Sequence, residues 1–244
     1  MIGSTIVHLD TVDSSNNYAA KELLTKSLKE GTVFVAACQQ AGRGQRDAQW
    51  ESAKGLNLTF SIVLYPEQVA VVNQFSISKA ISLGVTDFLS QHIEGVSIKW
   101  PNDIFVNDKK IAGILIETAI SSGKFSRAIV GIGLNINQEV FLSEAPNPVS
   151  LKNLTGKTYD LSELLASMCT CLDNRYRSLI RRDYSILQLE YVKLLYRKGI
   201  WANYKAAEGD FEGRILGVEN DGRLQIETRF GEVRGFYFKE VAFS

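Results

Sequence analysis

The chain has 244 residues, of which 45% are hydrophobic, enough for one large core and a small additional domain. Lys and Arg together number 27, as do Asp and Glu, so the formal net charge of +0 argues against nucleic acid as the main partner. Three cysteines cannot form a fully paired disulfide framework, no apolar run reaches the roughly 20 residues of a membrane-spanning helix, and the first residues lack the basic segment of a signal peptide. We therefore expect a cytoplasmic protein.

The first elements are read from capping residues and β-rich runs. A helix is predicted to begin at Ser14 or Ser15 and to end before Gly31, because serine caps free helix amides and glycine ends helices. Residues 32 to 38 and 56 to 65 are predicted strands. The connection between these strands is longer than most structural linkers, which makes it a candidate functional loop.

The remaining elements define the fold class. Apolar spacing predicts a long helix over residues 69 to 92 and helical structure from 161 to about 196. Between them, strands are predicted at residues 96 to 100, 104 to 106, 111 to 119 and 127 to 136. Short alternating runs after residue 200 predict a small β-barrel of about five strands. We expect an α+β fold with a mixed, largely antiparallel sheet flanked by helices, and two domains, residues 1–196 and 197–244.

Several motifs for other chemistries are incomplete. The Gly156-Lys157-Thr158 run lacks the earlier glycine of a phosphate-binding Walker loop, because residue 151 is Leu. Cys169 and Cys171 have no second pair of zinc ligands, since the two histidines lie at distant positions in the sequence. These segments are interpreted as a turn and a partly buried helix.

Residues 39 to 46, QQAGRGQR, lie between the first two predicted strands and are dense in Gly and Arg. Glycines let backbone amides approach an anion closely, and a guanidinium can hold a phosphate or carboxylate with two parallel hydrogen bonds. Alone, this segment is better interpreted as a flexible surface loop with solvated arginines. It becomes a candidate anion site only together with a second cationic cluster.

That second cluster is the run from Lys99 to Lys110. Lys99-Trp100-Pro101-Asn102-Asp103 is placed at a strand end, and Lys109-Lys110 leads directly into the apolar strand IAGILIE. A lysine that enters a buried strand is costly unless its ammonium has a partner. Lys109 is interpreted as a strand-end lysine that reaches water. Lys110 is the candidate functional residue.

Four ordered motifs together resemble a known family. QQAGRG (39 to 44) with Trp50, KWPNDI (99 to 104), KIAGILIE (110 to 117) and VGIGLNIN (130 to 137) resemble the catalytic domain of biotin protein ligases, also called biotin–[acetyl-CoA-carboxylase] ligases. The resemblance implies a class II synthetase-like catalytic domain, followed by a small SH3-like barrel. It also implies that biotin and ATP form biotinyl-5′-AMP with release of pyrophosphate, and that biotin then passes to a lysine of a biotin carboxyl carrier protein.

The resemblance also implies residue roles. Lys110, Arg43 and Lys99 are implied to be catalytic, because joining a carboxylate to the α-phosphate of ATP brings two anions together. The residues implied to bind biotin are Ser14, Ser15, Asn16, Gln39, Gly42, Arg43, Gly44, Gln45, Lys110, Gly113, Gly131 and Gly133. The residues implied to bind ATP or the adenylate are Arg43, Arg46, Trp50 (near the adenine), Lys99, Asn102, Lys110 and Asn135. Asp103 is a candidate for Mg²⁺ carried by the ATP phosphates, or for orienting Lys99.

The glycine-arginine segment departs from the family pattern. Many relatives read GRGRRGR before the tryptophan, whereas this chain has Gln45 in place of an arginine and Asp47 in place of a glycine. We hypothesise that the chain retains its adenylate less tightly than relatives with the full arginine set, unless Arg46 substitutes. A Gln45→Arg variant that releases the intermediate at an unchanged rate would refute this.

Two alternatives remain beside the biotin interpretation. A lipoate ligase or octanoyltransferase of similar fold also acylates a carrier lysine, but the polar cluster at residues 14 to 16 and the KWPND and GRG motifs favour biotin. A non-catalytic domain that binds a small acid or nucleotide is the other alternative. We expect no tightly bound prosthetic group and no membrane partner. We also expect no DNA partner, because Ser14 lies too early in the sequence for a helix-turn-helix domain before it. A homodimer is expected from family habit.

Overall fold

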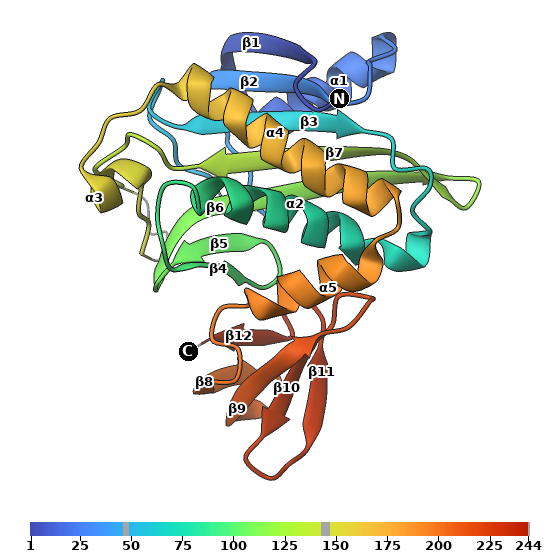
Figure 1. Cartoon of the computed structure of the whole chain (residues 1–244), viewed down its shortest axis with the longest axis vertical. Helices are drawn as coiled ribbons and strands as arrows, with labels where there is room; N and C mark the ends of the chain where they lie inside the picture. The colour runs from blue at the N-terminus through green and yellow to red at the C-terminus, as the bar shows by residue number, and fades with distance from the viewer. Residues whose placement is uncertain (46–48, 143–146, 244) are drawn as a thin grey trace.

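A seven-stranded mixed sheet forms the centre of the computed structural model, which describes residues 1–45, 49–142 and 147–243 (Figure 1). Its strand order is β1-β2-β3-β7-β6-β5-β4. β1 runs parallel to β2 and every other neighbouring pair is antiparallel, which confirms the prediction of a mixed, largely antiparallel sheet. The strands are β1 (Thr5–Val12), β2 (Thr32–Gln39), β3 (Leu58–Leu64), β4 (Val96–Lys99), β5 (Asp103–Val106), β6 (Lys109–Ser121) and β7 (Lys124–Leu134).

Helices cover the two faces of the sheet unequally. α2 (Phe75–Leu89) and α4 (Leu161–Ile180) pack together on one face over the main hydrophobic core. α1 (Ser15–Thr25) lies against β2, β3 and β7 with a smaller apolar cluster around Ala19. Figure 1 shows α2 and α4 crossing the near face of the sheet and α1 at the edge where β1 and β2 lie. The far face therefore has room for a pocket beside α1.

Residues alternate between these faces along the central strands. In β7, Val130, Ile132 and Leu134 belong to the main core, whereas Gly131 and Gly133 face away from it. In β3, the even-numbered residues belong to the main core, and they alternate with residues that face α1, such as Ser61. Because side chains in a strand point to opposite faces in turn, the same strands can build a dense core on one side and a glycine-lined surface on the other.

Two predicted helices differ from the observed ones. The predicted helix over residues 69 to 92 is α2 preceded by a short 3₁₀ turn at Val71–Asn73. The predicted helical segment from residue 161 to 196 is two helices, α4 and α5 (Tyr184–Lys193). Arg182 lies between them with φ of 66°, a left-handed conformation that cannot continue an α-helix.

A second, five-stranded antiparallel sheet follows α5 in the chain. Its order is β11-β10-β9-β8-β12, and no described strand of it pairs with the seven-stranded sheet. The prediction of about five C-terminal strands is therefore confirmed, although the described ladder pairs do not join β11 to β12 and close a barrel. The strands are β8 (Trp201–Ala206), β9 (Gly209–Val218), β10 (Leu224–Thr228), β11 (Val233–Phe236) and β12 (Val241–Phe243).

The turn between β9 and β10 packs against the first turns of α2 and the end of β4. The indole nitrogen of Trp100 donates to the carbonyl of Gly222 at 2.9 Å. Lys79 of α2 is 1% exposed, with its ammonium 5.3 Å from the Phe75 ring, and burial lowers the pKa of Lys79 to about 8, although Asp221 of the turn opposes the shift. A cation is thus buried where the two sheets meet.

Helix length and cysteine state complete the description. Within the parts of the chain that the structure describes, no helix combines the length and apolar character needed to cross a bilayer. Cys38, Cys169 and Cys171 are all free thiols. Cys169 and Cys171 are buried residues of α4, which agrees with the interpretation as a helix.

Candidate active site

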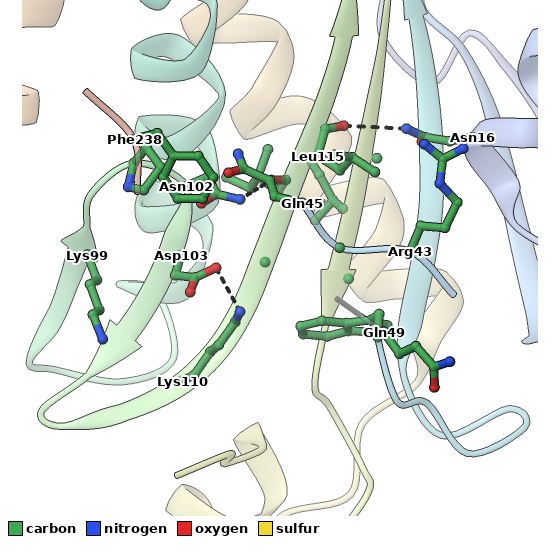
Figure 2. A pocket seen from close by; sticks show the side chains of 18 of the residues that line it. Asn16, Arg43, Gln45, Gln49, Lys99, Asn102, Asp103, Lys110, Leu115 and Phe238 are labelled. Carbon is green, nitrogen blue, oxygen red and sulfur yellow. Dashed lines mark hydrogen bonds and ion pairs between the residues drawn. The ribbon is translucent and has the colours of Figure 1, made fainter. Parts of the chain in front are cut away.

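A pocket of about 580 Å³ lies over the glycine-lined face of β6 and β7 (Figure 2). It is bounded by the start of α1, the glycine-arginine loop, the segment between β4 and β5, and the region around β12. Most of the residues expected to bind biotin or ATP line it: Ser14, Ser15, Asn16, Gln39, Arg43, Gly44, Gln45, Trp50, Lys99, Asn102, Asp103, Lys110, Gly113, Gly131 and Gly133. Motifs that are far apart in the sequence therefore meet at one cavity.

The floor of the pocket requires glycine at two positions. A Cβ atom on Gly133 would lie 2.3 Å from the Trp50 ring, and one on Gly131 would lie 2.4 Å from Oδ1 of Asn16. Both distances are far shorter than a van der Waals contact, so a side chain would displace what lies above the strand. Trp50 thus lies across β7, and its indole N–H is buried without a hydrogen-bond partner among the described residues.

One end of the pocket is a network of small polar groups. The hydroxyl of Ser61 lies 2.7 Å from that of Ser15 and 2.6 Å from Oδ1 of Asn16. The backbone N–H of Ser15 donates to Oε1 of Gln39 at 2.7 Å. Ser14, Ser15 and Asn16 are each less than 5% exposed, so this end is desolvated. Neutral donors and acceptors in a dry site suit a ligand with both N–H and carbonyl groups.

Arg43 lies at the same end of the pocket and is joined to two other elements. Its guanidinium donates to Oε1 of Glu117 in β6 at 2.6 Å and to the side-chain carbonyl of Asn17 in α1. The backbone at Arg43 also pairs with that at Gln49, where the loop returns to β6 and β7. Its expected role at phosphate oxygens stays a prediction, since its partner in the structure is a carboxylate.

Lys110 lies in the middle of the pocket, at the start of β6. Its ammonium forms an ion pair with Oδ1 of Asp103 at 2.8 Å and lies 5.7 Å from the Trp50 ring (Figure 2). The Lys110 side chain is 24% exposed, so it can meet a ligand without leaving its strand. Asp103 pairs with Lys110 rather than with Lys99.

Lys99 marks the other end of the pocket. Its ammonium lies 4.8 Å from the Phe105 ring and 5.0 Å from the ring of Phe243 in β12. Burial lowers the pKa of Lys99, an effect that Asp103 opposes and that Arg197 and Lys110 reinforce. An anion bound here would offset the cost of keeping this ammonium charged and buried.

Two residues of the predicted site, Asn135 and Gly42, do not line the pocket. Asn102 lines the pocket, but its amide nitrogen donates to the carbonyl of Ile114 at 2.5 Å. Asn135 is not among the lining residues; it is 3% exposed and donates to the carbonyl of Val149. Gly42 also lies outside the lining, where a Cβ would meet the carbonyl oxygen of Trp50 at 2.6 Å. Arg46 lies outside the described residues.

Several functional groups were missed from the sequence. Ser61 and Glu117 contact Asn16 from strands 45 and 101 residues away. Ser61 had no signal beyond its place in a predicted strand, whereas Glu117 ends the motif KIAGILIE but was given no role. The segment around β12 also contributes a wall, with Phe238, Lys239, Val241, Ala242 and Phe243. Cross-sheet contacts of this kind follow from strand order, which periodicity does not specify.

Comparison with known proteins agrees with this arrangement. Residues 9–135 match the biotin/lipoate A/B protein ligase family. The bifunctional ligase/repressor BirA of Bacillus spizizenii is 31% identical over 99% of this chain and 74% of the relative. A biotin–[acetyl-CoA-carboxylase] ligase of Paracoccus denitrificans is 28% identical over 91% of this chain and 94% of the relative.

Solved structures agree as well. The biotin protein ligase of Aquifex aeolicus in complex with biotin and ATP superposes with a TM-score of 0.82 and 26% identity, covering 99% of this chain and 100% of that one. The family match includes the polar end, the glycine-arginine loop, Lys110 and the glycine floor of the pocket. This chain belongs to the biotin/lipoate A/B protein ligase family.

Proposed function

We propose that this protein is an ATP-dependent biotin protein ligase, which joins biotin and ATP to biotinyl-5′-AMP with release of pyrophosphate and then transfers biotin to a lysine of a biotin carboxyl carrier protein. The observation that carries the proposal is the position of Lys110 between an end lined by small polar groups, where the Arg43 charge is paired with Glu117, and an end that holds the Lys99 ammonium. Biotin has a neutral ureido ring at one end and a carboxylate at the other. A pocket that joins these two environments brings that carboxylate to the phosphate site.

In the first step, the biotin carboxylate oxygen attacks the α-phosphorus and pyrophosphate leaves. Lys110 exchanges Asp103 for the two approaching anions and reduces their repulsion, because charge on the transferring phosphate needs a fixed cation beside it. Lys99 binds phosphate oxygens at the far end. In the second step, the neutral amine of the carrier lysine attacks the acyl carbon and AMP leaves.

The polar end binds the ureido ring through Ser14, Ser15, Asn16 and Gln39. Gly113, Gly131 and Gly133 let the bicyclic ring and its tail lie against the strands once the Trp50 ring, which covers Gly113 and Gly133 in the structure, moves aside. Gly42, Gly44 and Gln45 shape the loop above biotin. Trp50 covers the adenylate near the adenine, and Arg43, Arg46, Asn102 and Asn135 are the further nucleotide contacts implied by family resemblance. Covering the mixed anhydride keeps water from it.

Mg²⁺ fits this site as a companion of ATP. Asp103 is the only carboxylate among the described residues that line the pocket, and the described residues hold no group of three or more His, Cys, Asp or Glu side chains. Mg²⁺ commonly takes one or two carboxylates together with substrate phosphates. When bound, it neutralises phosphate charge, with Asp103 as its protein ligand.

The wider organisation is also part of the proposal. Residues 1–196 form the catalytic domain and residues 197–244 an SH3-like barrel, supported by the separate hydrogen-bonded sheet of β8 to β12. Free thiols at all three cysteines fit a cytoplasmic enzyme. A homodimer is a further expectation. The carrier's acceptor lysine docks at the open side of the pocket.

Biotin-dependent exchange of labelled pyrophosphate into ATP tests the proposal directly. We expect exchange with biotin and none without an acid substrate, followed by labelling of an added carrier domain. Exchange that prefers lipoate or octanoate over biotin would replace the proposal with the lipoyl alternative. No exchange with any of the three acids would leave the binding-domain alternative and an octanoyltransferase, which forms no adenylate.

A further inference from the structure

Glu117 of β6 contacts two parts of the site without being a lining residue of the pocket. Its Oε2 accepts a hydrogen bond from Nδ2 of Asn16 at 2.7 Å, and its Oε1 accepts one from the Arg43 guanidinium at 2.6 Å. Figure 2 shows Asn16 and Arg43 close together beside β6. One carboxylate on a rigid strand therefore joins the start of α1 to the glycine-arginine loop.

Glu117 is the nearer of two acceptors that fix which way the Asn16 amide points, because Nδ2 of Asn16 lies 2.7 Å from its carboxylate and 3.5 Å from the carbonyl oxygen of Leu115 (Figure 2). An ionised carboxylate can only accept hydrogen bonds, so the NH₂ group of Asn16 must face it. The carbonyl oxygen of that amide then faces Ser61 and lies directly above Gly131, at the floor of the pocket. A carbonyl oxygen has two lone pairs, so it can accept from Ser61 and from a ligand N–H together.

The same carboxylate also fixes the loop. Arg43 follows Gly42, and its guanidinium is bound to α1 through Asn17 and to β6 through Glu117. A charge-assisted hydrogen bond is roughly twice as strong as a neutral one. The Arg43 and Glu117 side chains are 42% and 38% exposed, so solvent weakens this pair, and loss of the charge at residue 117 would free the Asn16 amide and loosen the loop rather than release it.

We infer that Glu117 is a positioning residue for acid recognition: it orients the Asn16 carbonyl toward a ureido N–H and holds Arg43 and its loop over the same end of the pocket. This inference rests on the proposed biotin ligase function. Glu117 touches no reacting atom and acts through its two partners. Its effect therefore falls first on biotin binding and selectivity, through Asn16, and reaches the adenylation step only through Arg43.

Glu117→Gln tests the inference, because it keeps the size of the side chain and removes its charge. We expect KM for biotin in pyrophosphate exchange to rise about tenfold, the effect of losing one hydrogen bond to a charged group, and kcat to fall by a smaller factor than KM rises, through the loosened Arg43. We also measure exchange with two biotin analogues, each methylated on one ureido nitrogen. The wild-type preference for biotin over the analogue that blocks Asn16 should fall about tenfold, because the freed amide can present NH₂ instead.

Glu22→Gln is the matched control. Glu22 lies in α1 and pairs with Lys26 at 2.6 Å on the exposed surface, so its loss should leave KM and the preference unchanged. Should Glu117→Gln fail to fold, Glu117→Asp takes its place; it keeps the charge but is too short to reach both partners, and it should also raise KM and lower the preference.

The outcomes separate this inference from the function on which it rests. If the wild-type protein catalyses biotin-dependent exchange and a folded variant at residue 117 keeps both wild-type KM and wild-type preference, the inference is wrong and the function stands. If the wild-type protein shows no exchange, the proposed function is wrong, and the inference is overturned with it. A raised KM with a lowered preference supports both.

Discussion

The two faces of the central strands differ in composition, although their residues alternate along the same strands. On the helix side, β7 presents Val130, Ile132 and Leu134 to a dense apolar core. On the pocket side it presents Gly131 and Gly133, above which lie Asn16 and Trp50. Burial of large side chains stabilises the first face, whereas the absence of side chains creates the second. A substitution at an even-numbered position from 130 to 134 in β7 should therefore affect mainly stability. One at Gly131 or Gly133 should affect mainly ligand binding.

The largest expected effect is that of Lys110→Ala on the pocket side. Loss of the ammonium that offsets repulsion between the reacting anions should lower the rate of adenylation by about 10³-fold. The melting temperature of the variant should stay close to that of the wild type, because Lys110 lies in the cavity. Lys109→Ala, at an exposed position next to it, is the control for pyrophosphate exchange. A large fall in the melting temperature would instead indicate that Lys110 has a structural role.

Leu134→Ala probes the core side of the same strand. Leu134 is 0% exposed and belongs to the main core, so its truncation should reduce the free energy of unfolding by about 3 kcal/mol. KM for biotin and ATP should be unchanged below the new melting temperature. Denaturant unfolding and exchange kinetics check the two halves of this prediction. A large change in KM with little loss of stability would contradict the separation of the faces.

Gly133→Ala probes the adjacent residue on the pocket side. Its new Cβ would collide with the Trp50 ring, so we expect Trp50 to move and kcat/KM to fall about 30-fold, while the free energy of unfolding changes by less than about 1 kcal/mol. Trp fluorescence and exchange kinetics measure the two effects. Gly217→Ala in β9 is the control, because its Cβ would meet Val192 only at 3.6 Å and should leave activity intact. Equal activity of both variants would refute the role of the floor.

The smallest expected effect concerns Lys79, a charge on the core side. Its pKa is lowered to about 8 by burial, so the unfolded chain holds this proton up to higher pH than the folded chain does. The charged Lys79 side chain therefore lowers the free energy of unfolding by about 3 kcal/mol below pH 8. This penalty disappears as the pH rises from 8 to about 10.5. Lys79→Met should be about 2 kcal/mol more stable than the wild type at pH 7, after loss of the Phe75 contact.

Urea unfolding at pH 7 and pH 9.5 tests this difference. The gap between Lys79→Met and the wild type should shrink at the higher pH, and the exposed Lys21→Met variant should show no gap at either pH. A gap of constant size would mean that Lys79 does not titrate in this range.

Local patterns in the sequence predicted the strands of the core, and the resemblance of four ordered motifs to a known family predicted most of the pocket. β-Rich runs at residues 111 to 119 and 127 to 136 marked β6 and β7, and ordered family motifs marked Lys110 and the glycine floor. β1 was missed because its mostly exposed or half-exposed residues carry no clear apolar face; it exists through parallel pairing with β2. The break at Arg182 and the contacts of Ser61 and Glu117 depend on backbone conformation and strand order, which residue spacing does not encode.

The alternation of glycine with aliphatic residues also constrains how this part of the chain can change over time. Inserting or deleting one residue within β7 between positions 129 and 134 would shift every later side chain of the strand to the opposite side. Leucine or isoleucine would then fill the cavity while glycine left holes beneath the helices. Viable change in these strands should therefore proceed by substitution, with length variation confined to the connecting loops.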